Sequence, residues 1–293
     1  MITKDSKEKI KSPLNYIGGK YKLLDQLIPL FPEKINNFVD IFAGGFNVGI
    51  NTNAKKIYLN DNLFQLVDMY QEFYKKDAKN ILEHIKGRVK KFNLSLINTD
   101  GYKELRKYYN KNKNPLDLFV LTAYSFNHQI RFNNKHEFNN PFGKERSSFN
   151  KKMEENLILF LEEMHKKKII FSSKCFNDFD FSFLIKDDYV YCDPPYLITT
   201  GTYNDGKRGF KGWTEEEEIN LLKKLDELDA RGIKFGLSNV LEHKGKENVL
   251  LKGWLSKNKR YTKHQVSSNY NNSSYRNSET KQLKSIEVFI TNI

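Results

Sequence analysis

The Asp193–Tyr196 stretch, with the sequence Asp-Pro-Pro-Tyr, places a carboxylate and an aromatic ring in a rigid turn. It follows the apolar run 189–192, which predicts a buried strand. Because two consecutive prolines cannot donate to a sheet ladder or continue a helix, the chain must leave this strand abruptly. A carboxylate accepts hydrogen bonds from an amino group, and a ring stacks on a flat base. The turn therefore suits a planar group with an amino substituent, such as adenine. The alternative is an ordinary loop with an aspartate cap and a packing tyrosine.

A second group of candidate residues follows two strand-like runs nearer the N-terminus. The first run, residues 38–42, precedes a turn with Gly44, Gly45 and Gly49, and glycines there let the backbone approach a ligand closely. The second run ends in Asp61, where nucleotide-binding α/β folds carry an acid for ribose hydroxyls. This series predicts a cofactor site, although an ordinary β-α-β unit with a solvated aspartate would show it too.

A Gly-Gly-Lys sequence at 18–20 stands in front of a helical pattern that we expect to end near Pro29 to Pro32. Such a segment offers backbone N–H groups and an ammonium to an anion. It lacks the spacing of a phosphate-binding P-loop, and a plain turn explains it equally well.

The segment from Phe126 to Arg146 is dense in Asn, Arg, Lys and Phe, and its polar and aromatic residues alternate around 133–135. This alternation predicts an exposed hairpin. Arginine can bind guanine O6 and N7, Asn and Gln can pair with adenine edges, and aromatic side chains can wedge into a base step. We therefore favour a nucleic-acid reader over a polar surface loop.

The totals of the sequence favour a polyanionic partner. The 293 residues include 49 Lys and Arg against 36 Asp and Glu, which gives a net charge of +13. The codon bias of an AT-rich genome would also enrich lysine, so the charge is supporting information only. No apolar run is long enough to span a bilayer, and residues 1–11 lack a signal-peptide core, so we expect a cytoplasmic protein without membrane contact. The two cysteines form no disulfide framework or zinc-binding spacing.

Hydrophobic periodicity places these groups on an α/β sheet interrupted by a smaller domain. Strand-like runs cover residues 38–42, 57–61, 169–171, 189–192, 234–239 and 286–291, and residues 63–125 are predicted to be helical. We expect a catalytic domain made of residues 13–62 and 171–293, with an inserted domain at 63–170. Two explanations fit the lysine-rich helices of the insertion equally well. They could lie over the phosphate backbone of a nucleic acid, or their lysines could form only a solvent-exposed face. The loop at 197–212 is long enough to be a flexible functional element.

The order of these pieces resembles the Dam-type (D12 class, alpha-group) DNA adenine-N6 methyltransferases, from Pro13 to the C-terminus. In that class a cofactor half precedes a target-recognition domain and a catalytic half follows. The resemblance rests on residues 15–20, 42–45, 60–61, 131–143, 191–196 and 238–239. It implies a Rossmann-like S-adenosyl-L-methionine-dependent sheet, with an inserted, mainly helical DNA-recognition domain that carries a β-hairpin. It also implies double-stranded DNA as partner and no metal.

The resemblance implies a role for each matched residue. S-adenosyl-L-methionine would contact Tyr16, Lys20, Phe42, Ala43, Gly44, Asp61, Asp193 and Phe176, with Asp178 as a second candidate for the place of Phe176. The target adenine would be held through its amino group by Asp193 and the Pro194 carbonyl in the Pro194-Pro195 turn, and Tyr196 would stack on it. In the DNA, Arg131 would read a guanine, Phe126 would be the intercalating wedge, and Asn133 and Asn139 would contact phosphates. Further DNA contacts would come from Asn15, Asn127, Gln129 and Pro141.

Three positions depart from the pattern of the class. Asn15 stands where GATC-reading members usually carry lysine, Gln129 stands where an apolar residue commonly contacts thymine, and Phe46 interrupts the small residues of the glycine turn. The predicted recognition site is therefore GATC or a related sequence.

We predict a site-specific DNA adenine-N6 methyltransferase. It would serve a restriction-modification system with a cognate endonuclease, or act as a Dam-like orphan. The alternatives are methylation of RNA or another amino group, or a DNA-binding module without catalysis.

Overall fold

The structure is a computed structural model that describes residues 8–199, 212–267 and 285–293. Most of the loop expected at 197–212 and most of the N-terminal segment 1–11 lie outside these residues. Among the described residues, no helix combines the length and the apolar character that crossing a bilayer requires.

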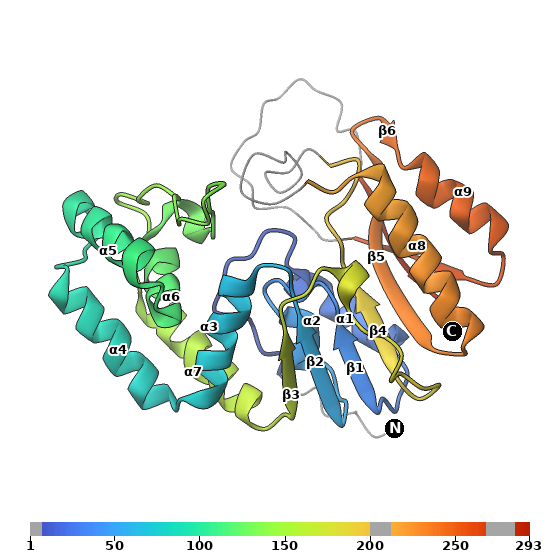
Figure 1. The fold of residues 1–293 in the computed structure, drawn as a ribbon, viewed down its shortest axis with the longest axis horizontal. Helices are drawn as coiled ribbons and strands as arrows, with labels where there is room; N and C mark the ends of the chain where they lie inside the picture. Colours follow the sequence, from blue (N-terminus) through green and yellow to red (C-terminus); the bar gives the residue numbers. More distant parts are fainter. Residues whose placement is uncertain (1–7, 200–211, 268–284) are drawn as a thin grey trace.

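The centre of the fold is an eight-stranded sheet with the order β3-β2-β1-β4-β5-β8-β7, and β6 pairs with β5 (Figure 1). Strands β3, β2, β1, β4 and β5 run parallel, whereas β8 is antiparallel to both β5 and β7. The bounds are β1 (Asn37–Asp40), β2 (Lys56–Asn60), β3 (Ile169–Ser172), β4 (Tyr189–Cys192), β5 (Lys234–His243), β6 (Lys246–Glu247), β7 (Thr262–Val266) and β8 (Ile286–Thr291). The predicted α/β fold with a mostly parallel sheet is confirmed.

The central strands β1 and β4 carry buried apolar residues on both faces, because helices cover both faces of the sheet. All of β4 is buried. Its alternation sends Tyr189 and Tyr191 into the core of one face, and Val190 and Cys192 into the core of the other. Phe38 of β1 lies with the tyrosines, and its ring centroid is 6.4 Å from that of Tyr191.

Helices form a layer on each side of the sheet. On the Tyr191 face lie η1 (Lys20–Leu23), α1 (Leu24–Leu27), η2 (Ile28–Leu30) and α2 (Asn47–Asn51), and on the opposite face lie η4 (Phe176–Asp178), α8 (Glu215–Ala230) and α9 (Val249–Lys257). The helical segment before the first strand ends at Leu30, as its prolines predict. The N-terminus of α8 carries a capping box, in which Thr214 and Glu217 each bond the other's backbone N–H.

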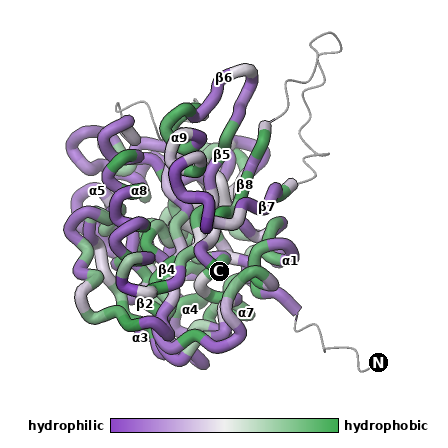
Figure 2. The backbone as a smooth tube through the Cα atoms, turned by 90° about the vertical axis from the view of Figure 1, so that its right-hand side faces the viewer, coloured by the Kyte–Doolittle hydropathy of each residue, from purple (hydrophilic) through white to green (hydrophobic). Residues whose placement is uncertain are grey.

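Residues 63–170 are mainly helical, as predicted for 63–125. They contain α3 (Phe64–Lys75), α4 (Ala78–Lys91), α5 (Thr99–Asn112), α6 (Pro115–Tyr124), η3 (Phe126–His128) and α7 (Lys151–His165), which lie together beside the sheet in Figure 1. Their buried side chains continue the core of the Tyr191 face, for example where the Phe46 ring meets Tyr70. In Figure 2 the outer helices α5 and α8 are largely hydrophilic. The assignment of 63–170 as a separate DNA-recognition domain stays a prediction.

Candidate active site

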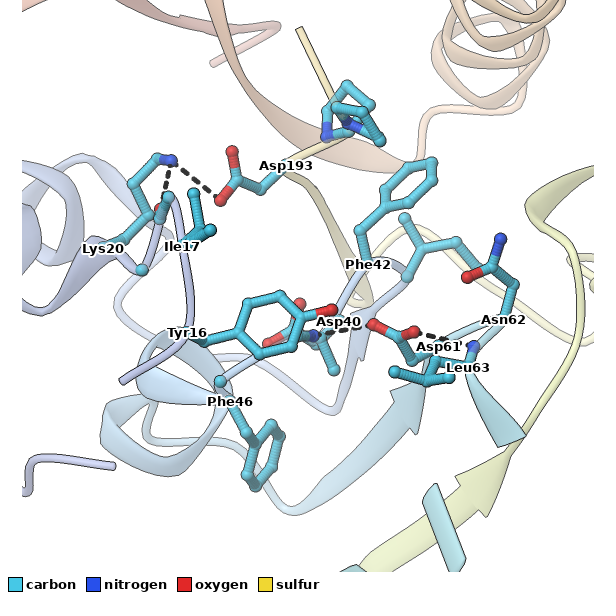
Figure 3. Close-up of a pocket in the computed structure, with 18 of the residues that line it drawn as sticks. Tyr16, Ile17, Lys20, Asp40, Phe42, Phe46, Asp61, Asn62, Leu63 and Asp193 are labelled. Carbon is cyan, nitrogen blue, oxygen red and sulfur yellow. Dashed lines mark hydrogen bonds and ion pairs between the residues drawn. The ribbon is translucent and has the colours of Figure 1, made fainter. Parts of the chain in front are cut away.

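A cavity of about 290 Å³ lies at the carboxyl ends of β1 and β4. The strand order reverses between these two strands, because the chain runs outward from β1 to β2 on one side and from β4 to β5 on the other. Open α/β sheets bind their ligands at such a switch point. Figure 3 shows side chains from the N-terminal segment, the turn after β1 and the end of β2 converging on this space with Asp193.

The structure brings most of the predicted site residues together around the cavity. The lining includes Tyr16, Lys20, Phe42, Ala43, Gly44, Asp61, Phe176, Asp193, Pro194, Pro195 and Tyr196, together with Gln129 and Arg131 of the predicted hairpin. Asp178 is exposed and does not line the cavity, whereas Phe176 is buried and does. The other predicted DNA contacts lie outside the lining: Asn15, Phe126, Asn127, Asn133, Asn139 and Pro141.

Asp61 ties the end of β2 to the glycine turn. Its Oδ2 accepts the backbone N–H of Gly44 at 2.8 Å, and its Oδ1 accepts that of Leu63 at 2.9 Å. Burial raises the pKa of Asp61, and the two backbone donors oppose this rise. Each carboxylate oxygen has a second lone pair, so Asp61 can still accept ligand hydroxyls on its cavity side.

The missing side chain of Gly44 makes room for Tyr16. Gly44 has φ +47°, and a Cβ there would lie 2.8 Å from Cε1 of the Tyr16 ring. In Figure 3 this ring reaches across the cavity toward Asp40 and Asp61. Tyr16 therefore closes one wall of the cavity directly against the backbone of the turn.

Phe46, which departs from the pattern of small residues, borders the cavity, but its ring points away from Asp40 and Asp61 (Figure 3). It has φ +56°, a left-handed conformation that is uncommon for an aromatic residue, and it is fully buried. Its ring packs among Tyr70 and Phe160 of the helical layer, with centroid distances of 6.0 and 6.4 Å. A Cβ on Gly49 would lie only 2.1 Å from this ring, so Gly49 supplies the space that Phe46 occupies.

Asp40 forms the floor of the cavity, a role that sequence reasoning missed. Its Oδ2 accepts the N–H of Gly49 at 3.1 Å, and its Oδ1 is buried with no hydrogen-bond partner among the described residues. Burial raises the pKa of Asp40 well above its usual range, and the nearby Asp193 adds to this rise. An unpartnered buried carboxylate oxygen suits a cationic group or another donor on a ligand.

An aromatic wall stands on the α8 side of the cavity. The rings of Phe42, Phe176 and Trp213 lie pairwise 5.4–5.6 Å apart between centroids. Glu218, which is fully buried, accepts the indole N–H of Trp213 at 2.7 Å and the side-chain N–H groups of Asn239 and Asn248 at 3.0 Å. The wall is therefore held in place from behind, and it suits a flat ring system.

The Asp193 carboxylate faces the cavity and contacts Lys20 and Tyr196. Lys20 Nζ lies 2.9 Å from Asp193 Oδ2, and the Tyr196 hydroxyl donates to Asp193 Oδ1 at 3.1 Å. Burial raises the pKa of Asp193, and the Lys20 ammonium opposes this rise. Lys20, which was predicted to hold the cofactor, thus forms an ion pair with Asp193, and both residues line the same cavity.

The predicted hairpin is present as a tight antiparallel turn with two isolated bridges, Ser125 to Phe142 and Phe132 to Phe138. The buried Phe132 and Phe138 anchor it to the helical layer, while the tip at residues 134–137 is exposed.

The hairpin presents polar side chains beside this anchor. Arg131 Nε donates to Asn139 Oδ1 at 3.0 Å. Arg131, predicted to read a guanine, is therefore oriented by Asn139, which was predicted to contact a phosphate. Phe126, the predicted wedge, is 41% exposed.

Asn15 joins the N-terminal segment to the base of the hairpin. Its Nδ2 donates to the backbone oxygen of Asn127 at 3.1 Å. Two predicted DNA-binding positions that are far apart in the sequence therefore lie side by side at the edge of the cavity.

Among the residues that sequence reasoning missed at this site, Asp40, Trp213 and Glu287 contribute most to its chemistry. Asp40 carried a usable signal, because it lies at the end of a buried run directly before the glycine turn. Trp213 precedes the cap of α8 and carried only its aromatic type as a signal. Glu287 interrupts the apolar run of β8, and a lone acid in a strand is more often a solvated side chain.

Comparisons with known proteins match this arrangement to a family. The model of the D12 class N6 adenine-specific DNA methyltransferases matches residues 16–271. The type II methyltransferase M.FokI of Planomicrobium okeanokoites is 52% identical over 97% of this chain and 43% of its own length. The modification methylase StsI of Streptococcus sanguinis is 50% identical over 98% of this chain and 43% of its own length. The DNA adenine methylase of Escherichia coli K12 is 28% identical over 79% of this chain and 81% of its own length.

The chain thus spans less than half the length of the first two relatives, although almost all of it matches them. Because the family model covers most of the residues, including the glycine turn, Asp61, the hairpin and the Asp193–Tyr196 turn, the chain belongs to the D12 class N6 adenine-specific DNA methyltransferases.

Proposed function

We propose that this chain transfers a methyl group from S-adenosyl-L-methionine to N6 of an adenine in duplex DNA. The observation that carries the proposal is the Asp193 carboxylate, which faces the switch-point cavity beside the Tyr196 ring. A carboxylate accepts N–H hydrogen bonds, and a flat ring stacks on a base, so this pair suits an adenine presented edge-on.

The cavity residues fit S-adenosyl-L-methionine. The unpartnered Asp40 Oδ1 suits its ammonium, the spare lone pairs of Asp61 suit its ribose hydroxyls, and the wall of Phe42, Phe176 and Trp213 suits its adenine ring. When bound, the cofactor supplies a methyl group on a positively charged sulfur, and such a carbon accepts a nucleophile directly.

The protein's part in the reaction is positioning and electrostatics. An adenine amino nitrogen is a weak nucleophile because its lone pair is delocalised into the ring. Asp193 and the Pro194 carbonyl would hold the two N–H groups and favour a tetrahedral nitrogen, with its lone pair directed toward the cavity. When bound, S-adenosyl-L-methionine would supply the methyl carbon and keep the electron pair of its broken sulfur–carbon bond, and the nitrogen would release its surplus proton to solvent water while Asp193 holds the remaining N–H group.

The target base must leave the duplex to reach Asp193, which costs a few kcal/mol. Tyr196 would offset part of this cost by stacking, and the exposed Phe126 would fill the gap in the helix. Arg131 and Gln129 line the cavity from the hairpin side, so they would read bases next to the flipped adenine. Asn15, Asn127, Asn133, Asn139 and Pro141 would complete the DNA contacts.

The relatives named as modification methylases favour a role in restriction-modification, with DNA as the substrate. In such a role the chain would act in the cytoplasm, and a cognate endonuclease would act on the same DNA site. This chain would then supply one methylating unit of a longer system, because it matches 43% of the length of M.FokI.

The test is methyl transfer from radiolabelled S-adenosyl-L-methionine to duplex DNA, followed by nucleoside analysis. We expect label in N6-methyladenine, and Asp193→Ala should abolish transfer while cofactor binding by calorimetry is kept. Glu247→Ala, a change on the exposed hairpin strand β6, is the control. Label in N4-methylcytosine, in RNA offered in competition, or in protein would refute the proposal.

A further inference from the structure

Glu287 is an acid on the inner part of strand β8, and its side chain is only 14% exposed. It pairs in register with Val240 of β5 and Val266 of β7. Strand alternation puts Glu287 on the same face as Phe289, whose ring packs on Phe31 of the N-terminal helical segment. This is the face on which Lys20 lies.

The strand next to Glu287 is irregular. The register between β5 and β8 shifts between Val240 and Glu242, immediately beside the Glu287 pair. Such bulges occur next to active sites, where they redirect a side chain. Because β8 runs antiparallel to β5, its first residues, Glu287 among them, lie at the carboxyl end of the parallel strands, where the Asp193 turn follows β4.

Glu287 shares both partners of Asp193. The Tyr196 hydroxyl lies 3.1 Å from Asp193 Oδ1 and also 3.1 Å from Glu287 Oε1. Lys20 Nζ lies 2.9 Å from Asp193 and 3.7 Å from Glu287. A phenol has one O–H hydrogen, so it can donate fully to only one of these carboxylates at a time.

The two carboxylates differ in access to the cavity. Asp193 lines it and Glu287 does not, although both contact Tyr196. Asp193 already accepts Lys20 on Oδ2 and Tyr196 on Oδ1, so the target amino group would add a third donor to this carboxylate and weaken its bond to the Tyr196 hydroxyl. Without a second acceptor, the buried hydroxyl would lose its hydrogen bond when the base arrives, which is costly.

We propose that Glu287 is a positioning residue that takes over the Tyr196 hydroxyl when Asp193 engages the target amino group. Glu287 keeps the Tyr196 ring at the angle needed for stacking and leaves Asp193 available to the substrate. This inference rests on the proposed function, since it assumes that a base reaches Asp193.

The experiment is a double-mutant cycle with Glu287→Ala and Tyr196→Phe, measured as kcat and KM for DNA. We expect Glu287→Ala to lower kcat by roughly 10–100-fold, with cofactor binding unchanged. The double variant should be no slower than the slower single variant, because both changes remove one hydrogen bond. Effects that multiply, or an unchanged kcat in Glu287→Ala, would overturn the inference.

Two further variants separate this role from general stability. Glu287→Gln keeps an oxygen that can accept the phenol, so it should recover most of kcat, whereas a purely charge-based role predicts no recovery. Glu247→Ala removes an exposed carboxylate of the same sheet and should leave kcat unchanged.

A readout without activity uses 3-fluorotyrosine at position 196. Its fluorine resonance should move in Glu287→Ala and also in Asp193→Ala, since each change removes one acceptor of the Tyr196 hydroxyl. If the wild-type chain transfers no methyl group but the resonance moves, the shared contact stands and the proposed function fails. If the resonance ignores Glu287→Ala, the inference itself fails.

Discussion

The ammonium of Lys20 lies 2.9 Å from Asp193 Oδ2. This ion pair joins the first residue of η1 to the turn after β4, and Lys20 is 5% exposed. The turn that faces the cavity is thus held by a residue from a distant part of the sequence.

Replacing Lys20 with Met should shift the pH dependence of the reaction. The ammonium lowers the pKa of Asp193, so its loss raises that pKa further. Asp193 must be ionised to accept the amino group, and therefore the acidic limb of the kcat/KM profile should move to higher pH.

At pH 7 we expect a loss of about 10–100-fold in kcat/KM for the Lys20 variant. Lys20→Arg, which keeps the charge, is the control and should keep the acidic limb near its original position. Tyr196, Glu287, Asp40, Tyr191 and Cys192 also act on Asp193 or respond to its charge. An acidic limb that stays in place in Lys20→Met would contradict the prediction.

Gly49→Ala should destabilise the fold by about 1–3 kcal/mol, because the new methyl group would overlap the Phe46 ring. Gly87→Ala in the exposed part of α4 is a matched control, since nothing lies within 4 Å of its Cβ position, and it should stabilise by up to ~1 kcal/mol. Urea unfolding measures both, and equal effects of the two changes would disprove the steric explanation.

Asp61→Asn should weaken cofactor binding by roughly 10-fold and lower the free energy of unfolding by about 1–3 kcal/mol. An amide offers one acceptor oxygen, whereas the backbone N–H groups of Gly44 and Leu63 each use one carboxylate oxygen. One donor would then face an NH₂ group. Calorimetry with S-adenosylhomocysteine measures the binding, and Asp68→Asn on the partly exposed face of α3 is the control.

Cofactor binding should quench the fluorescence of Trp213. The chain has two tryptophans, so a Trp254→Phe background leaves Trp213 as the reporter. Its ring belongs to the aromatic wall with Phe42 and Phe176. Titration with S-adenosylhomocysteine should quench this background but not the Trp213→Phe variant, and equal quenching in both would place the ligand elsewhere.

Arg131→Ala should relax recognition at one base pair by about 1–3 kcal/mol while methyl transfer to other sites persists. Arg131 lines the cavity and is oriented by Asn139. Sequencing of methylated positions in an expressing host reads the change directly. Lys135→Ala at the exposed tip is the control and should weaken DNA binding without altering the recognised sequence.

Much of the fold was predictable because its signals are local. Apolar runs marked β1, β2, β3, β4, β5 and β8, and the prolines at 29 and 32 marked the end of the first helical segment. Turn chemistry located Asp193–Tyr196 and the glycine turn, and both line the cavity.

The missing parts of the site depend on contacts that no local pattern encodes. Glu287 reaches Tyr196 across 91 residues because the antiparallel strand β8 begins at the carboxyl end of the parallel strands, and Trp213 meets Phe42 only through the packing of α8 on the sheet. The contact between Asn15 and Asn127 is similarly long-range. The direction of the Phe46 ring could not be predicted from the sequence, because it depends on packing against Tyr70 of α3 and Phe160 of α7.

Phe46 and Gly49 also constrain how this family can diverge. The ring at position 46 fills the volume that a side chain at position 49 would need, so substitutions at the two positions depend on each other. A lineage that gains any side chain at 49 must first lose the ring at 46, and one that restores a small residue at 46 frees 49 to vary. Among descendants of this chain, the pair should therefore coevolve, while Gly44 stays fixed by the Tyr16 ring that packs against it.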